Sequence, residues 1–178
     1  MWLAGRGAGR VCLPPELTLA SIAVLAKLGR EEGVAVEVWG HGRLPLAISG
    51  RCYHARLHDR IKDSCQFVCG EDPDGRDVAT LDGQPFLAVN GVQTLSQSTA
   101  SMAHQVEALV EAGVTSLRLS PQSQGFGSVC AGYANRLAGR ITAPALEGLL
   151  RPLVPGQRLS DGFPAGAFGA SWSGAAGG

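Results

Sequence analysis

A strand–helix–strand pattern near the start of the chain is the feature that most restricts its fold. "GRVCLP" at 9–14 is a short apolar run between glycine and proline, which predicts a buried strand. In the segment 15–33 apolar residues recur at helical spacing, Thr18 is a candidate N-cap, and Gly33 ends the pattern. "VAVEVWG" at 34–40 is again rich in strand-forming residues. Strand, helix and strand in this order form the unit of a parallel sheet, so the sequence predicts an α/β fold.

Later segments extend the same alternation. "VATLDGQPFLAVNG" at 78–91 predicts two strands joined at Asp82-Gly83, which is a favoured hairpin dipeptide. Helices are expected within 101–113, 125–141 and 144–153. The strands expected to be of the parallel type are 10–13, 34–39, 86–90 and 115–120. Four such strands amount to half of an eight-stranded (β/α)8 barrel. The pattern leaves open whether the sheet is open and self-sufficient or part of a larger fold.

Composition restricts the class of protein. The chain has 178 residues, of which 45% are hydrophobic, so 1–178 is expected to form a single domain. Fifteen basic and fifteen acidic side chains give a formal charge of zero, which argues against general binding of nucleic acid or of a membrane surface. No apolar run is long enough to span a membrane and no leader peptide is evident, so a cytoplasmic location is expected. The glycine-rich segment 161–178 is predicted to be a flexible tail.

Three cysteines lie close together in a polar, basic segment. Cys52, Cys65 and Cys69 have the spacing C-x12-C-x3-C. If "DSCQFVC" forms a helical turn, the last two thiols share one face of it. Four basic residues surround the first gap and favour the thiolate, which is the form that binds metal; these are Arg51, Arg56, Arg60 and Lys62. Sites rich in thiolate select zinc or iron–sulfur clusters, and reduced thiols are the rule in the cytoplasm.

Other interpretations of the cysteines stay open. A reduced cysteine is often only a small buried hydrophobe, and this is the favoured interpretation of Cys12 and Cys130. His41, His54 and His58 lie near the cluster, and any of them could complete a structural zinc site. The sequence contains no C-x-x-C pair, nucleophile elbow, phosphate-binding loop or H-E-x-x-H motif, so thioredoxin-type and common hydrolase chemistry are not indicated.

The segments "EVWGHGRLPLAISGRC" and "KDSCQFVC" resemble the collagenase-like peptidase superfamily, peptidase family U32. The hallmark of that family is a glutamate–apolar–aromatic stretch, then His-Gly, then Ser-Gly-Arg-Cys. "GRVCLPPEL", "FLAVNGVQTLS" and "SLRLSPQ" are also similar, so the resemblance covers residues 8–122 and is most specific between 36 and 70. Peptidase-like members carry a cysteine four residues after the histidine of His-Gly, where this chain has Pro45. That difference resembles the branch of the family that acts in oxygen-independent ubiquinone biosynthesis.

The resemblance implies a fold, a cofactor and a partner. The fold would be a (β/α)8 barrel of the TIM type, and Cys52, Cys65 and Cys69 would be three of the four ligands of a 4Fe-4S cluster. The protein would form a heterodimer with a second family member and hydroxylate quinone precursors without molecular oxygen, with prephenate as oxygen donor. The fourth ligand would lie upstream of the matched region, so the chain resembles the C-terminal half of such a barrel, with a cysteine-bearing insertion. Proteolytic activity is not expected.

Two alternatives remain, and one further set of residues is predicted. The chain could be a peptidase-like or RNA-hydroxylating member of the same superfamily, although Pro45 speaks against this, or a structural module that binds zinc. In a barrel, sites lie at the carboxyl ends of the strands. Polar residues near those ends are therefore the predicted substrate-binding residues, namely His41, Asn90, Gln93 and Ser120. The sequence does not indicate which residues are catalytic.

Overall fold

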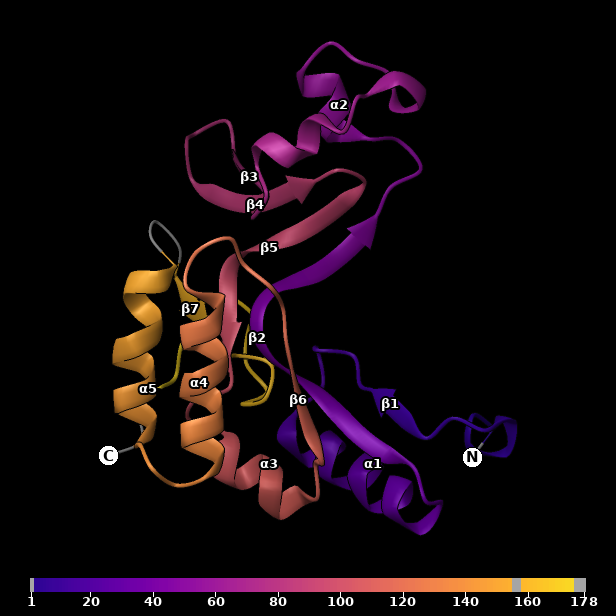
Figure 1. Cartoon of the computed structure of the whole chain (residues 1–178), viewed down its shortest axis with the longest axis vertical. Helices are drawn as coiled ribbons and strands as arrows, with labels where there is room; N and C mark the ends of the chain where they lie inside the picture. The colour runs from indigo at the N-terminus through magenta and orange to yellow at the C-terminus, as the bar shows by residue number, and fades with distance from the viewer. Residues whose placement is uncertain (1, 155–157, 175–178) are drawn as a thin grey trace.

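The fold is built around one open, mixed sheet (Figure 1). The computed structural model describes residues 2–154 and 158–174. The strands in these residues are β1 (Arg10–Cys12), β2 (Ala35–Ile48), β3 (Arg76–Ala79), β4 (Pro85–Asn90), β5 (Gln93–Ser101), β6 (Ser116–Leu119) and β7 (Leu159–Ser160). The α-helices are α1 (Leu19–Glu31), α2 (Tyr53–Leu57), α3 (Val106–Ala112), α4 (Phe126–Leu137) and α5 (Ala143–Leu150). Short 3₁₀ turns are η1 (Ala4–Arg6), η2 (Lys62–Ser64), η3 (Val68–Glu71) and η4 (Arg151–Leu153).

Strand β2 is long and changes its partners along its length. Its first half pairs in parallel with β1 and β6, and its second half pairs antiparallel with β5. Glu37 pairs with residues of both β1 and β6, and His41 pairs with residues of both β5 and β6. At Glu37 and at His41 the strand therefore has a neighbour on both edges. Beyond His41 it extends with β5 into the upper part of the molecule in Figure 1.

The expected α/β class is confirmed, but the expected set of parallel strands is partly wrong. β4, which covers the predicted strand 86–90, pairs antiparallel with both β3 and β5. The reason is local, because only Gly91 and Val92 separate β4 from β5, and parallel strands need a crossover connection of a dozen or more residues. The polar strand β5 lacked an alternating pattern and was not predicted. The result in the described residues is an open mixed sheet and not half of a barrel.

Two apolar cores hold the helices to the sheet. In the first, α1 and α3 pack with β1 and β2 through Leu13, Ile22, Ala26, Val36, Val38, Met102 and Leu109. In the second, α4 and α5 pack with the segments around β6 and β7 through Ala103, Val129, Tyr133, Leu146, Leu150, Val154 and Leu159. The predicted N-cap of α1 is confirmed, since Thr18 Oγ1 accepts a hydrogen bond from the amide of Ser21 at 3.2 Å. Helix α3 begins at Val106, later than predicted, because β5 extends to Ser101.

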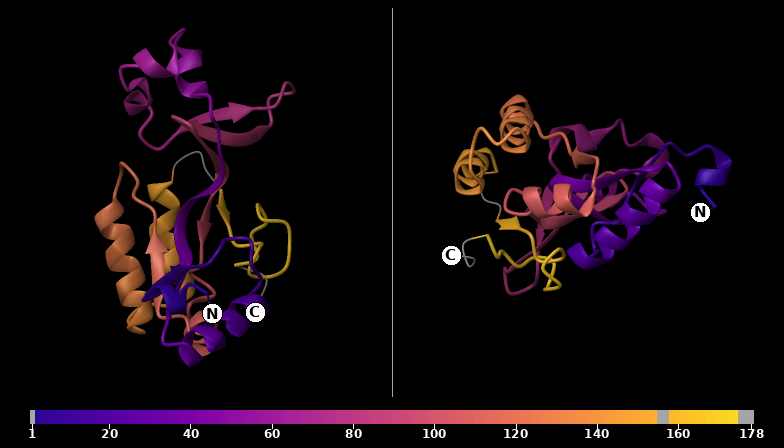
Figure 2. Two further views of the ribbon diagram at one scale, coloured as in Figure 1. Left: turned by 90° about the vertical axis from the view of Figure 1, so that its right-hand side faces the viewer. Right: turned by 90° about the horizontal axis from the view of Figure 1, so that it is seen from below.

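The cysteine segment forms a separate lobe. Residues 49–75, called here the cysteine lobe, connect β2 to β3 and lie beyond the far end of the sheet (Figures 1 and 2). The single helical turn considered for "DSCQFVC" does not form. Gln66 and Phe67 both have φ of +54°, which interrupts the chain between η2 and η3. Cys65 and Cys69 are therefore not placed by i,i+4 helical geometry.

The end of the chain is described up to residue 174. Asp161 is 2% exposed, and its carboxylate accepts hydrogen bonds from Gln105 Nε2 at 2.9 Å and from the amide of Ser173 at 2.6 Å. The rest of the predicted tail, residues 175–178, lies outside the described residues. Among the described helices, none combines the length and apolar character needed to cross a bilayer.

Candidate functional site

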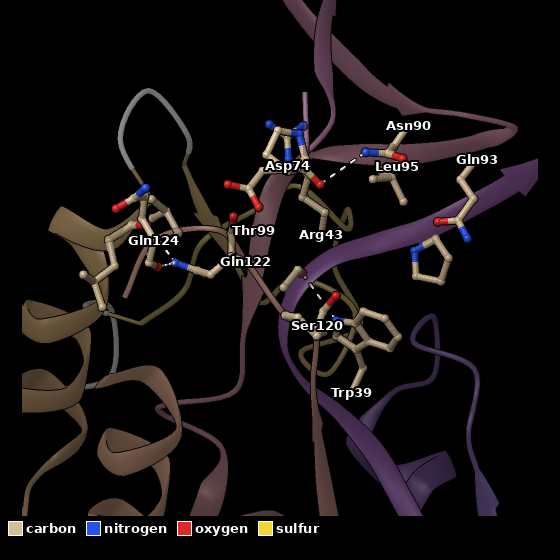
Figure 3. A pocket seen from close by; sticks show the side chains of 16 residues that line it. Trp39, Arg43, Asp74, Asn90, Gln93, Leu95, Thr99, Ser120, Gln122 and Gln124 are labelled. Atoms are coloured by element: carbon tan, nitrogen blue, oxygen red, sulfur yellow. Dashed lines mark hydrogen bonds between the residues drawn. The ribbon is translucent and has the colours of Figure 1, made fainter. Parts of the chain in front are cut away.

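A polar cavity of about 590 Å³ lies where the cysteine lobe meets the rest of the sheet (Figure 3). β2, the end of β4, β5, the loop after β6 and residues 73–74 of the cysteine lobe contribute to its walls. Trp39 and Leu95 provide apolar surface, and Arg43 provides a positive charge. A cavity of this size, with a few polar groups that converge on it, is typical of a site for a small molecule.

The structure brings the predicted substrate-binding residues together. Asn90, Gln93 and Ser120 all line the polar cavity (Figure 3). His41 is fully buried, and one of its ring nitrogens, Nε2, lies 2.9 Å from Oε1 of Gln122, which is itself a lining residue. His41 is thus connected to the cavity through its hydrogen bond with the lining residue Gln122. That these residues bind a substrate stays a prediction.

Sequence reasoning missed several lining residues. Arg43 donates through Nη1 to the carbonyl oxygen of Ser96 at 3.2 Å and through Nη2 to Asp77 at 2.6 Å. Asp74 accepts a hydrogen bond from the amide of Ser123 at 2.7 Å, which ties the cysteine lobe to the loop after β6. Asp74 and Gln122 lie in loops with no periodic signal. Arg43 could have been predicted, because it lies two residues after His41 on one strand and residues at that spacing share a face of the sheet.

His41 belongs to a buried polar network. The hydroxyl group of Tyr133 donates to the carbonyl oxygen of Gly40 at 2.7 Å and lies 3.0 Å from the hydroxyl group of Ser101. Burial lowers the pKa of His41, and the hydrogen bond with Gln122 opposes this only in part. Burial also raises the pKa of Tyr133. Both rings are therefore held in their neutral forms.

The neutral state of His41 predicts a pH dependence of stability. Because the pKa of His41 is lower in the folded than in the unfolded chain, the unfolded chain binds more protons just below about pH 6.5. The free energy of unfolding should therefore fall as the pH drops from about 7.5 to about 5.5. Urea unfolding at both pH values measures this change, which should be smaller in the His41→Gln variant. An equal pH dependence in the variant would contradict the assignment to His41.

The first cysteine borders a second, strongly basic cavity. This open cavity of about 570 Å³ is lined by Cys52 together with Arg51, Arg56, Arg60 and Lys62. Cys52 is buried at the start of α2, and its sulfur accepts a hydrogen bond from the amide of Ala55 at 3.3 Å. The basic residues around the first cysteine gap thus share the wall of one cavity with a thiol.

The other two lobe cysteines are half-buried in the same lobe. Arg60, from the wall of the basic cavity, donates through Nη1 to the carbonyl oxygen of Cys65 at 3.0 Å. The sulfur of Cys69 lies 3.9 Å from the point where a Cβ atom would stand on Gly91. Gly91 follows Asn90 of the polar cavity, so Cys69 lies beside the β4–β5 turn at the cavity edge.

In the described part of the chain, the three lobe thiols do not converge on one point that a zinc ion could occupy. Zinc bound by three thiolates and a histidine needs ligand atoms that meet at one point. Among the described residues, no group of three or more possible metal ligands that includes a cysteine has its ligand atoms within 4.8 Å of one another. A 4Fe-4S cluster places each thiolate on a different iron atom, so its ligands surround a volume. The basic wall would offset the negative charge of thiolates and cluster.

The remaining cysteines lie elsewhere. Cys12 is in β1, and burial raises the pKa of its thiol. Cys130 is in α4, beside the second core. His41 lies beneath the polar cavity, whereas His54 and His58 are in the cysteine lobe. The five cysteines are all reduced, and only three of them belong to that lobe.

Comparison with protein-family models identifies a family. A family model described as peptidase family U32 matches residues 1–131 of the chain. A search of solved structures finds no significant match. The matched range includes the β2 residues that line the polar cavity and the whole cysteine lobe, which lines the basic cavity.

Proposed function

The chain belongs to peptidase family U32, and on that premise we propose that it is a UbiV-like iron–sulfur protein of oxygen-independent ubiquinone biosynthesis. It would act with a UbiU-like partner, as a heterodimer, in the hydroxylation of ubiquinone precursors. The observation that carries the proposal is the position of Cys69. This thiol lies beside Gly91, next to Asn90 of the polar cavity. A redox cofactor and a small-molecule site would therefore be neighbours.

In this proposal the cysteine lobe holds the cofactor. Cys52, Cys65 and Cys69 would be three ligands of a 4Fe-4S cluster, and the basic cavity wall would compensate its charge. When bound, such a cluster supplies one-electron redox chemistry. The barrel and the fourth ligand that the family resemblance implies are part of the proposal for the complete protein.

The polar cavity would bind the organic substrate. Trp39 and Leu95 offer apolar contact to a ring, and Asn90, Gln93 and Ser120 offer hydrogen bonds. Hydroxylation without molecular oxygen needs another source of the oxygen atom, and the resemblance implies prephenate. Arg43 lines this cavity and is the residue that would attract a carboxylate of such a donor.

Pro45 supports the ubiquinone-biosynthesis branch of the family over the peptidase-like and RNA-hydroxylating branches. Pro45 lines the polar cavity and lies at a register shift between β2 and β5. The cysteine that other members carry at this position would therefore stand at the cavity wall. The chain has a chemically inert proline ring there, so this position of the cavity wall offers no thiol.

An apolar recess on the cysteine lobe supports the presence of a partner. Tyr53, Leu57, Val78, Leu87 and Val89 line a recess of about 470 Å³ between α2 and the sheet. Leu57 is 56% exposed, and Tyr53 is 49% exposed. Clustered exposed apolar side chains commonly mark an interface.

Complementation tests the proposed function. The chain is produced in a bacterium that lacks its own UbiV but retains UbiU, and ubiquinone is measured after growth without oxygen. We expect restored ubiquinone, and a reduction to about a tenth or less with Gln93→Ala, because binding groups in the cavity typically contribute a factor of this order. Gln84→Ala is the control, because this exposed glutamine lies in the β3–β4 turn, outside the cavity. Absence of ubiquinone alongside hydroxylated RNA or cleaved peptide would favour the alternative branches.

A further inference from the structure

A group of buried polar atoms without hydrogen-bond partners lies in the cysteine lobe. His54 is fully buried, and neither of its ring nitrogens has a hydrogen bond. Nε2 of His58 and Oδ2 of Asp72 are also buried and without a hydrogen bond. Buried polar atoms are nearly always paired, so four such atoms in one small region require an explanation.

The geometry of these atoms is that of ligands around a common point. One ligand atom from each of His54, His58 and Asp72 lies within 4.8 Å of the other two. Nε2 of His54 is 3.0 Å from Oδ2 of Asp72, yet the two atoms are not aligned as a hydrogen bond. The two imidazole rings are parallel, with 5.6 Å between centroids and 4° between planes. A cation between the three residues would pair with one ligand atom of each residue, and so with three of the four atoms at most.

The local sequence explains why these residues meet. His54 and His58 are four residues apart at the start and end of α2, so both rings project from the same side of this short helix. H-x3-H is a recurrent spacing of zinc-binding histidines. Asp72 follows η3, which packs against α2.

The charged neighbours are compatible with a bound ion. Oε2 of Glu71 lies 4.0 Å from Nδ1 of His58, which leaves Nε2 of that ring for a metal. Metal-bound histidines commonly direct their second nitrogen toward a carboxylate in this way. Nη1 of Arg76 approaches Oδ2 of Asp72 only to 3.7 Å. It therefore does not replace a ligand at that oxygen.

We propose that His54, His58 and Asp72 bind a divalent transition-metal ion, of which zinc is the representative, at a site separate from the three cysteines. Two imidazoles and one carboxylate suit zinc and its neighbours, whereas magnesium and calcium prefer oxygen ligands alone. The ion joins α2 to η3 and thereby closes the loop that carries Cys65. Its role is to stabilise the fold of the cysteine lobe.

Cobalt binding tests the site. The probe is Co²⁺, added to the full-length chain in which Cys52, Cys65 and Cys69 are all replaced by serine, and then displaced by Zn²⁺. We expect one Co²⁺ per chain, with visible ligand-field bands and without the near-ultraviolet charge-transfer band of cobalt–thiolate bonds. His58→Gln and Asp72→Asn should each weaken binding by a factor of about 100 or more, since even indirect supports of a metal site contribute roughly 10–100-fold.

The control is His104→Gln, because His104 also pairs with a carboxylate, that of Glu147 at 2.9 Å, but lies outside the lobe. This variant should bind Co²⁺ as tightly as its parent. If the triple serine chain does not fold, the unsubstituted chain should bind a Co²⁺ ion without thiolate charge transfer, in addition to any thiolate-bound metal. Absence of stoichiometric binding, or binding that His58→Gln and Asp72→Asn leave unchanged, would overturn the proposal. Iron–sulfur reconstitution is a separate readout, so failure of one proposal does not decide the other.

Discussion

Serine in place of Cys65 or of Cys69 is expected to abolish retention of an iron–sulfur cluster, whereas Cys130→Ser is expected to retain it. Cys65 and Cys69 are half-buried in the cysteine lobe, which also carries Cys52. Serine keeps the size of the side chain but is a poor ligand for iron, because such clusters are held by thiolates. Cys130 lies in α4, outside that lobe, so its loss should leave the ligand set unchanged.

The measurement is the iron and acid-labile sulfide content after anaerobic reconstitution, together with the broad visible absorbance of the cluster. Cys130→Ser is the matched control, since Cys130 is also half-buried and reduced. Equal loss of the cluster in Cys130→Ser would show that the ligand assignment is incorrect. A colourless wild-type chain that binds one zinc ion through its thiols would contradict the cluster itself.

The second large effect is expected at Gly42. This residue has φ of +121°, a conformation that side chains rarely adopt, and a Cβ atom here would lie 2.4 Å from Cβ of Ser120. Gly42→Ala therefore combines backbone strain of about 1–3 kcal/mol with an overpacking cost of similar size. We expect the free energy of unfolding to fall by about 2–6 kcal/mol in total. Ser120 should also be displaced from the polar cavity.

Urea unfolding measures this change, and Gly50→Ala is the control. Gly50 has no atom within 4 Å of its would-be Cβ, and its φ is not positive. Its replacement should change stability by less than about 0.5 kcal/mol, as is usual at open surface positions. A Gly42→Ala chain as stable as wild type would refute the close approach of β2 to Ser120.

The parts of the fold that the sequence predicted correctly are those with strong local signals. Helix α1 has a regular apolar face and the Thr18 cap, and the β3–β4 hairpin has its Asp82-Gly83 turn. β5 was missed because "QTLSQSTAS" has the polar composition of a loop. It is a strand because long-range pairing with β2 and β4 satisfies its backbone, which no local pattern encodes.

The candidate site could be predicted from the sequence only in part. Asn90, Gln93 and Ser120 were proposed from their positions at the expected strand ends, and all three line one cavity. That agreement holds although the strand arrangement behind it was partly wrong, because the loop after β6 and the β4–β5 turn still meet beside β2. The grouping of His54, His58 and Asp72 depends on the packing of η3 against α2. The sequence offered each histidine only as a residue that could complete a zinc site with the cysteines, and only tertiary structure brings both together with the aspartate.

The continuity of β2 has a consequence for how the two halves of the molecule can move. A single strand of fourteen residues carries Trp39 in the parallel part, and it carries Pro45 beside the lobe. A substrate in the polar cavity, which both residues line, and a cofactor in the lobe that follows Ile48 would be joined through hydrogen-bonded backbone. Electron transfer between them would then take place over a distance that thermal motion changes little. Rate constants for such a transfer should accordingly be insensitive to solvent viscosity.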